Sequence, residues 1–236
     1  MRSPLLILWD IDHTLIKTGG VGREIFGEAF AAATGQVMKD MPEATGHTEP
    51  DLFRETLAMH GIEEAPEYFS IFAKTQAEGY KRRAEELLRR GEILPGILEA
   101  LDSLGRTPRV VQSVLSGNTR AAATAKLDIF GLSQSLELDI GAYGDDESHR
   151  PHLVSIAQKR AETKHGYPFS REETILIGDT VRDVYAGDQG GARVIAVATG
   201  RTSINQLRDA RPETVLPDAR DHTALLTALG IPFTDT

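Results

Sequence analysis

The chain has 236 residues, with 26 Lys and Arg against 35 Asp and Glu, and its formal net charge at pH 7 is −9. Because an acidic protein with dispersed basic residues repels a phosphate backbone, we expect no nucleic-acid partner. Cys is absent and no apolar run is longer than five residues, whereas a membrane-spanning helix needs about 20. We therefore expect a cytoplasmic monomer or homodimer that has no disulfide and does not cross a membrane.

Short apolar runs recur along the chain, separated by stretches of helical length. The first is residues 5–9, which end at a charged residue and are typical of a strand buried on both faces. The later predicted strands are 110–115, 136–140, 174–177 and 194–197, and the predicted helices of this part are 95–104, 119–130, 151–165, 182–190 and 221–229. This alternation predicts an α/β fold with a parallel sheet covered by helices.

Residues 17–91 differ from the rest, because they hold no convincing strand and are predicted to be helical throughout, including 49–60 and 66–90. Segments that contain Gly or Pro bracket this interval at 18–22 and 91–96, which suits either paired hinges or ordinary loops. The interval predicts a helical subdomain inserted into the α/β core.

Acidic residues follow two of the predicted strands. Asp10 and Asp12 come after the first strand, where alternating side chains allow both to project to one side, and Asp179 and Asp183 have the i,i+4 spacing of one helical face. Parallel strands end at the same edge, where open α/β sheets bind ligands, and four converging carboxylates repel one another unless a cation neutralises them. We therefore predict a Mg²⁺ site, with a solvated turn and a helix N-cap at Asp179 as the alternatives.

Two further segments lie at predicted strand ends. Ser116, Gly117 and Asn118 follow the strand at 110–115, and a hydroxyl with backbone N–H groups at such a turn can hold a phosphate. Arg150, just before a proline, places a permanent cation near the same edge. A plain turn with an N-cap, and a surface arginine, are the alternatives for these two segments.

Four motifs follow one another along the chain: Asp10-Ile11-Asp12-His13-Thr14, Ser116, Arg150-Pro151 and Gly178-Asp179-Thr180-Val181-Arg182-Asp183. Together they resemble the motifs of the haloacid dehalogenase-like hydrolase superfamily, above all its phosphoglycolate phosphatases, over nearly the whole chain. The resemblance implies a Rossmann-like parallel sheet with helices on both faces at residues 1–17 and 92–236. It also implies an all-helical cap at residues 18–91.

The resemblance further implies a Mg²⁺-dependent phosphatase for a small phosphorylated metabolite such as phosphoglycolate or a sugar phosphate. Asp10 would attack phosphorus and form an aspartyl-phosphate, while Asp12 would act as general acid and base. Asp10 and Asp179 would bind Mg²⁺ through their side chains and Asp12 through its backbone carbonyl, with Asp183 supporting the metal site.

Phosphoryl oxygens would be held by Ser116, with Gly117 and Asn118, and by Arg150, which replaces the Lys more frequent in the family. His13 stands where phosphatases of the family usually have Gly, so this loop departs from the family pattern.

Recognition of the leaving group is expected from the cap. The turn Thr45-Gly46-His47-Thr48 and the nearby Arg54 are candidates to face the substrate, with a surface turn and N-cap as the alternative. The alternative functions are a phosphosugar mutase of the β-phosphoglucomutase type and a non-catalytic metal- or phosphate-binding protein on the same fold. A dehalogenase is disfavoured because members with that chemistry typically lack an acid corresponding to Asp12.

Overall fold

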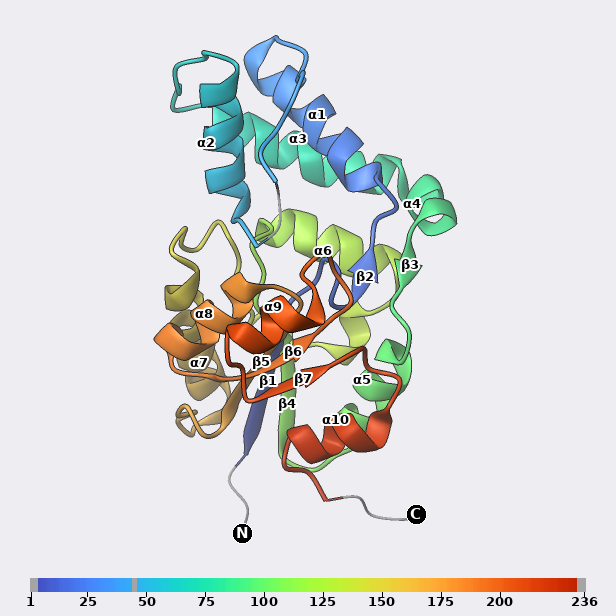
Figure 1. The fold of residues 1–236 in the computed structure, drawn as a ribbon. Helices are drawn as coiled ribbons and strands as arrows, with labels where there is room; N and C mark the ends of the chain where they lie inside the picture. Colours follow the sequence, from blue (N-terminus) through green and yellow to red (C-terminus); the bar gives the residue numbers. More distant parts are fainter. Residues whose placement is uncertain (1–3, 44–45, 233–236) are drawn as a thin grey trace.

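A parallel sheet of five strands forms the centre of the protein, of which the computed structural model describes residues 4–43 and 46–232. The strand order is β4 (Val110–Val114), β1 (Leu5–Trp9), β5 (Thr174–Gly178), β6 (Arg193–Val197) and β7 (Thr214–Leu216) (Figure 1). In β1 every residue from Leu6 to Trp9 is 0 % exposed, so the apolar run packs on both faces. The predicted parallel sheet is confirmed.

Helices cover both faces of the sheet, as Figure 1 shows. Ile7 of β1 shares one apolar core with α5 (Ile97–Gly105), α6 (Arg120–Ile129) and α10 (His222–Ala228). Its neighbour Leu6 points to the opposite face, because side chains alternate along a strand. That face is covered by α7 (Arg150–His165) and α8 (Val181–Gly190), with α9 (Ile204–Asp209) beside β6. Each of these helices except α9 was predicted to within two residues at both ends.

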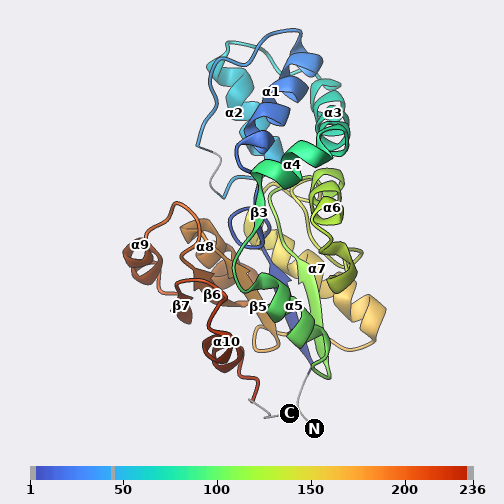
Figure 2. The same cartoon turned by 90° about the vertical axis from the view of Figure 1, so that its right-hand side faces the viewer.

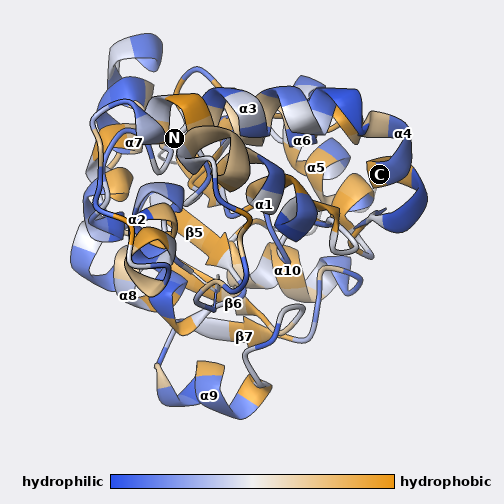
Figure 3. Cartoon of the chain, turned by 90° about the horizontal axis from the view of Figure 1, so that it is seen from above, coloured by the Kyte–Doolittle hydropathy of each residue, from blue (hydrophilic) through white to orange (hydrophobic). Residues whose placement is uncertain are grey.

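Four helices form a separate layer at the carboxyl end of β1, and we call them the helical insert. They are α1 (Val21–Thr34), α2 (Glu49–Met59), α3 (Tyr68–Arg82) and α4 (Ala84–Arg90). A short antiparallel pair, β2 (Ile16–Lys17) and β3 (Glu92–Ile93), joins the insert to the rest (Figure 1), and Figure 2 shows β3 below α4. Viewed from above in Figure 3, the apolar strand β5 is seen between α2 and α1 of the insert.

The insert has an apolar core of its own. Phe26 and Phe30 of α1, Phe53 of α2 and Phe72 of α3 are all at most 3 % exposed. The Phe53 and Phe72 rings lie 4.6 Å apart between centroids, within the range of favourable aromatic contacts. These side chains explain why α1, α2 and α3 hold together apart from the sheet.

Three details of the predicted elements are wrong. Residues 136–140 form no strand: the amides of Leu138 and Ile140 bond back to the carbonyls of Leu136 and Glu137, which closes local turns. Its apolar residues Leu136 and Ile140 are buried, at 7 % and 2 % exposure, without pairing as a strand. Residues 66–90 form two helices, α3 and α4, rather than one. The strands β2, β3 and β7 were missed, since two or three residues are too short for a pattern, and so was the six-residue helix α9.

Candidate active site

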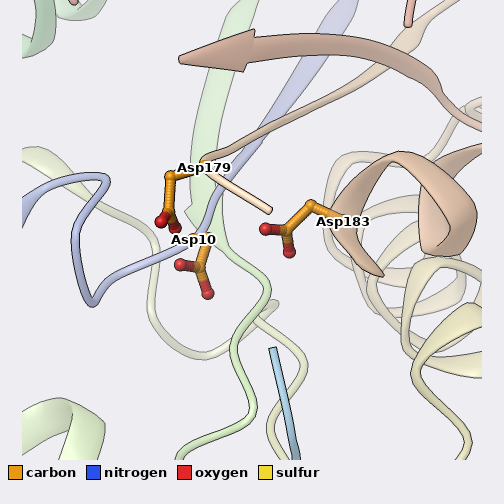
Figure 4. A group of neighbouring side chains, drawn as sticks. All are labelled: Asp10, Asp179 and Asp183. Carbon is orange, nitrogen blue, oxygen red and sulfur yellow. The ribbon is translucent and has the colours of Figure 1, made fainter. Parts of the chain in front are cut away.

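Three carboxylates converge where β1 and β5 end. Asp10 follows β1 and its amide bonds to the carbonyl of Ile177 in β5, so the two strand ends lie side by side. Asp179 follows β5 directly, and Asp183 lies in the first turn of α8. One carboxylate oxygen from each of the three acids lies within 4.8 Å of the other two (Figure 4). We call these residues the three-acid cluster.

The start of α8 is capped by Thr180 and not by Asp179. The Thr180 hydroxyl accepts the Asp183 amide at 3.1 Å, and the Asp183 carboxylate accepts the Thr180 amide at 3.0 Å. This reciprocal capping box fixes Asp183 at the third helical position and leaves Asp179 outside the helix. Their closeness therefore comes from a strand end meeting a helix start, which corrects the predicted common helical face and the N-cap alternative for Asp179.

Arg150, at the start of α7, is the positive charge of this cluster. Its guanidinium donates to Asp10 Oδ1 at 2.9 Å and also bonds to Asp183. Burial, followed by the charge of Asp183, raises the pKa of Asp10, and Arg150 opposes this rise. Burial and then Asp10 and Asp183 raise the pKa of Asp179 in the same way. These carboxylates are therefore costly to ionise together without further positive charge.

The composition of the cluster fits a divalent cation. Three ionised carboxylates carry a charge of −3 and Arg150 carries +1, which leaves −2 in a buried site. Carboxylate oxygens are also the hard ligands that Mg²⁺ prefers in proteins. Asp10, Asp179 and Asp183 can thus hold a magnesium ion, and Thr14 donates to Asp179 Oδ1 at 3.4 Å from the adjacent loop.

Asp12 lies outside the cluster and has its own partners. The ammonium group of Lys126 contacts both carboxylate oxygens, at 2.8 and 3.0 Å, and Asn118 Nδ2 donates to Oδ2 at 2.8 Å. Burial by itself raises the pKa of Asp12, but Lys126, together with Asn118 and His13, outweighs this effect and holds that pKa below its ordinary value. Two carboxylates that are two residues apart therefore stand in opposite electrostatic surroundings.

The segment after β4 lies between Asp12 and the insert. Ser116 is buried, and its hydroxyl accepts the side-chain amide of Asn118 at 2.7 Å. A Cβ at Gly117 would overlap the backbone carbonyl of His47 and lie 3.1 Å from Arg150 Nη1. The structure thus brings Ser116, Gly117, Asn118 and Arg150 to the same strand edge as the acids.

Two buried charged residues of this region were not singled out from the sequence. Lys126 lies in α6 among buried alanines and a leucine, and a lysine within an apolar helix face is the signal that could have revealed it. Glu49 opens α2, where its carboxylate accepts the Thr119 amide and Gln76 Nε2, both at 2.6 Å. Burial raises the pKa of Glu49 to about 7, although Lys126 and these hydrogen bonds oppose the rise. Nothing in the sequence around Glu49 indicates that burial.

The remaining candidates from the sequence are His13, His47, Arg54 and Thr45. His13 adopts a φ of 63°, a left-handed conformation that explains why Gly is usual at this point of the family motif. His47 Nε2 lies 3.0 Å from Arg182 Nη2 in α8. Arg54 is 54 % exposed and pairs with Asp51 and Glu64, and the structure does not bring it to the acids. Thr45, part of the predicted turn, lies outside the described residues.

Among the described residues, the helices are all too short or too polar to be candidates for crossing a membrane.

The family model of the haloacid dehalogenase-like hydrolases matches residues 7–197. A pyrophosphatase PpaX of Oceanobacillus iheyensis is 21 % identical, over 96 % of this chain and 97 % of that protein. The crystal structure of a hydrolase from Pseudomonas syringae superimposes with a TM-score of 0.69 at 21 % identity, over 95 % of this chain and 98 % of that one. CbbY from Rhodobacter sphaeroides, solved in complex with phosphate, gives a TM-score of 0.69 at 19 % identity, over 97 % of this chain and all of the other.

The family match covers most of the chain, and the three-acid cluster lies at the strand ends where the motifs were expected. The chain belongs to the haloacid dehalogenase-like hydrolases. It is a hydrolase, and the phosphatases among its relatives support a phosphoric monoester hydrolase.

Proposed function

We propose that this protein is a Mg²⁺-dependent phosphatase of small phosphorylated metabolites in which Asp10 is the nucleophile. The observation that carries the proposal is the separation of two neighbouring carboxylates. Asp10 lies in the three-acid cluster beside Arg150, whereas Asp12 lies against Lys126 and Asn118. A nucleophile and a general acid and base need such different surroundings.

The first step forms a bond from an Asp10 oxygen to phosphorus and breaks the bond from phosphorus to the leaving oxygen. Arg150 fixes Asp10 Oδ1 at 2.9 Å, so the other carboxylate oxygen remains for attack. Asp12 gives the leaving oxygen its proton and later takes one from the water that hydrolyses the aspartyl-phosphate. The lowered pKa of Asp12 suits its action as a general base in the second step. To act as a general acid in the first step, Asp12 must first take up a proton.

Phosphoryl oxygens would be held by Ser116, Gly117 and Asn118 on one side and by Arg150 on the other. A magnesium ion held by Asp10, Asp179 and Asp183, with the carbonyl of Asp12, would offset the negative charge that nucleophile and phosphate bring together. Arg150 is suited to this position because its guanidinium stays charged and offers several donors in one plane.

The helical insert, within residues 18–91, would act as the cap over the core of residues 1–17 and 92–236. The Glu49 amide donates to the Gly117 carbonyl at 2.7 Å, and the Glu49 side chain accepts the Thr119 amide. These contacts tie the first turn of α2 to the phosphate-binding segment, so that movement of the insert would open or close the site. Phosphoglycolate and sugar phosphates are the substrates we expect. The cytoplasmic location and the monomeric or homodimeric state stay predictions.

Release of inorganic phosphate from a panel of phosphoglycolate, sugar phosphates and nucleotides tests the proposal. Release should require Mg²⁺, stop with EDTA, and be lost in Asp10→Asn but kept in Asp209→Asn, an exposed acid on α9. Isomerisation of a sugar phosphate without phosphate release would instead identify a phosphosugar mutase. A folded protein that neither binds Mg²⁺ nor turns over any of these compounds would contradict the enzymatic proposal.

A further inference from the structure

A cavity of about 440 Å³ lies between the insert and the core. Glu43 and His47 line it from the insert, and Thr180, Arg182, Arg201 and Gln206 are among the residues that line it from the core. Its volume is within the range of small-molecule sites.

Two residues that line the cavity, Thr180 and Arg201, each directly follow a residue that belongs to the three-acid cluster or touches it. Thr180 directly follows Asp179. Arg201 directly follows Gly200, where a Cβ would overlap the Asp179 carboxylate and lie 3.3 Å from His13 Cβ. The cavity therefore lies next to the three-acid cluster, close to where the proposed phosphoryl group would be held.

The lining of the cavity has more basic than acidic side chains. Within the part of the chain that the structure describes, neither Arg182 nor Arg201 forms an ion pair with a carboxylate. Some other core arginines are paired, as Arg160 is with Asp146 and Arg193 with Glu213. Among the described residues that line the cavity, Glu43 is the single acid, against two arginines. An anion is the ligand that this lining favours.

His47 lies against Arg182 at one side of the cavity. Arg182 Nη2 lies 3.0 Å from His47 Nε2, and a carboxylate oxygen of Glu55 lies 3.5 Å from the same nitrogen. Nδ1 is buried, and no hydrogen-bond partner for it occurs among the described residues. Arg182 and His47 thus line the cavity side by side.

The contact between the insert and Arg182 depends on Gly46. This residue has a φ of 69°, and a Cβ there would lie only 2.8 Å from both Cβ and Cδ of Arg182. The chain thus places His47 and Arg182 against each other by a close backbone approach that a larger residue would prevent.

We propose that Arg182, Arg201 and His47 bind a second anionic group of the substrate, so that the preferred substrates are phosphate esters or anhydrides carrying a carboxylate or a second phosphoryl group. This inference rests on the proposed phosphatase function. A carboxylate and a phosphoryl group share the acceptor chemistry that these three side chains recognise, and the substrates of the test distinguish them.

The test compares phosphoglycolate, pyrophosphate and 2-hydroxyethyl phosphate, whose second group is a carboxylate, a phosphoryl group and a neutral hydroxyl. Wild type should prefer one or both of the two-anion compounds by at least about tenfold in kcat/KM. In Arg182→Gln/Arg201→Gln this preference should fall by about tenfold or more, mainly through KM. Arg208→Gln removes an exposed charge outside the cavity and should keep the preference.

Measurements of ligand binding distinguish the proposed anion site from the proposed phosphatase function. Calorimetry with Asp10→Asn protein should show that phosphoglycolate or pyrophosphate binds at least about tenfold more weakly when both arginines are replaced. Absence of phosphate release together with this binding pattern would contradict the phosphatase function and leave the anion site standing. Equal kcat/KM for all three substrates, or an equal loss of preference in Arg208→Gln, would overturn the anion site and leave the phosphatase function standing.

Discussion

Lys126 Nζ lies 2.8 Å from Asp12 Oδ2 and 3.0 Å from Asp12 Oδ1. The same nitrogen bonds to Asn118 Oδ1 at 2.6 Å and lies 5.0 Å from the centre of the Tyr80 ring in α3. One buried cation thus joins the proposed acid and base, the phosphate-binding segment and the insert. Asp12 is therefore held in place by α6 as well as by its own loop.

Lys126→Met should lower kcat with little change in KM. Methionine keeps the bulk of the side chain but removes the cation that orients Asp12, and general acid–base catalysis contributes about 10²- to 10⁴-fold to rates. We expect a loss of about 10²-fold in steady-state phosphate release. Lys159→Met, an exposed lysine on α7, is the matched control. A change confined to KM would contradict this role for Lys126.

Mg²⁺ should stabilise the fold through the three-acid cluster. At a free Mg²⁺ concentration of about 100 times its Kd, binding to the native state alone adds about 2.7 kcal/mol to the free energy of unfolding. Asp183→Asn keeps an oxygen for the Thr180 amide but removes a charge, so its Mg²⁺-dependent gain should be much smaller. Thermal melts with and without Mg²⁺ measure both, and the same gain in Asp183→Asn would place the metal elsewhere.

The pH dependence of stability should reveal the buried Glu49. Its pKa in the fold is about 7 against an ordinary value of 4.5, so its contribution to stability is complete below pH 4.5 and lost as the pH rises through 7. Gln76 Oε1 is buried without a partner in the described structure, and a protonated Glu49 can donate to a Gln76 amide that has turned over. Glutamine at position 49 offers the same donor at every pH.

Glu49→Gln should therefore gain stability relative to wild type between pH 4.5 and 7, by roughly 3 kcal/mol over the whole interval. Urea unfolding at a series of pH values measures this difference. In the control Glu78→Gln, which changes an exposed acid on α3, the free energy of unfolding should depend on pH as it does in wild type. If the free energy of unfolding of Glu49→Gln changed with pH in the same way as that of wild type, Glu49 would be ionised in the fold at these pH values.

Gly117→Ala should separate the insert from the core, because the added methyl group would overlap the carbonyl of His47. The Glu49 amide, which donates to the Gly117 carbonyl, should then lose protection against hydrogen exchange. Gly105→Ala is the control, since its nearest neighbour beyond the local chain is 3.8 Å from the new Cβ. Unchanged protection in Gly117→Ala would mean that the contact tolerates a side chain.

Much of the fold could be predicted because it follows from local pattern. The run at 5–9 is apolar on both faces and ends at Asp10, so it indicates a central strand with an acid at its end. Residues 136–140 alternate apolar side chains with Glu137 and Asp139 and form turns instead, since burial demands apolar side chains whether or not the backbone pairs in a sheet. The pattern of apolar residues in a sequence therefore indicates which side chains are buried more directly than it indicates whether the backbone pairs in a sheet.

The site was partly predictable for a similar reason. Asp10, Asp179 and Asp183 stand at strand and helix ends that topology brings together, and these positions can be seen in the sequence. Lys126 and Glu49 reach the site through the packing of α6 and α2, which depends on the tertiary fold. The same holds for Arg182 and Arg201, whose common cavity forms only where the insert meets the core.

Covalent trapping at Asp10 tests the central claim most directly. Wild-type protein mixed with Mg²⁺ and a substrate that the panel identifies, then quenched in acid within a single turnover, should carry a phosphoryl group on the peptide that contains Asp10. Mass spectrometry should find no such group in Asp10→Asn or in EDTA. Phosphate release by the wild type with an unmodified Asp10 peptide at every quench time, or a phosphoryl group on another residue, would contradict the account.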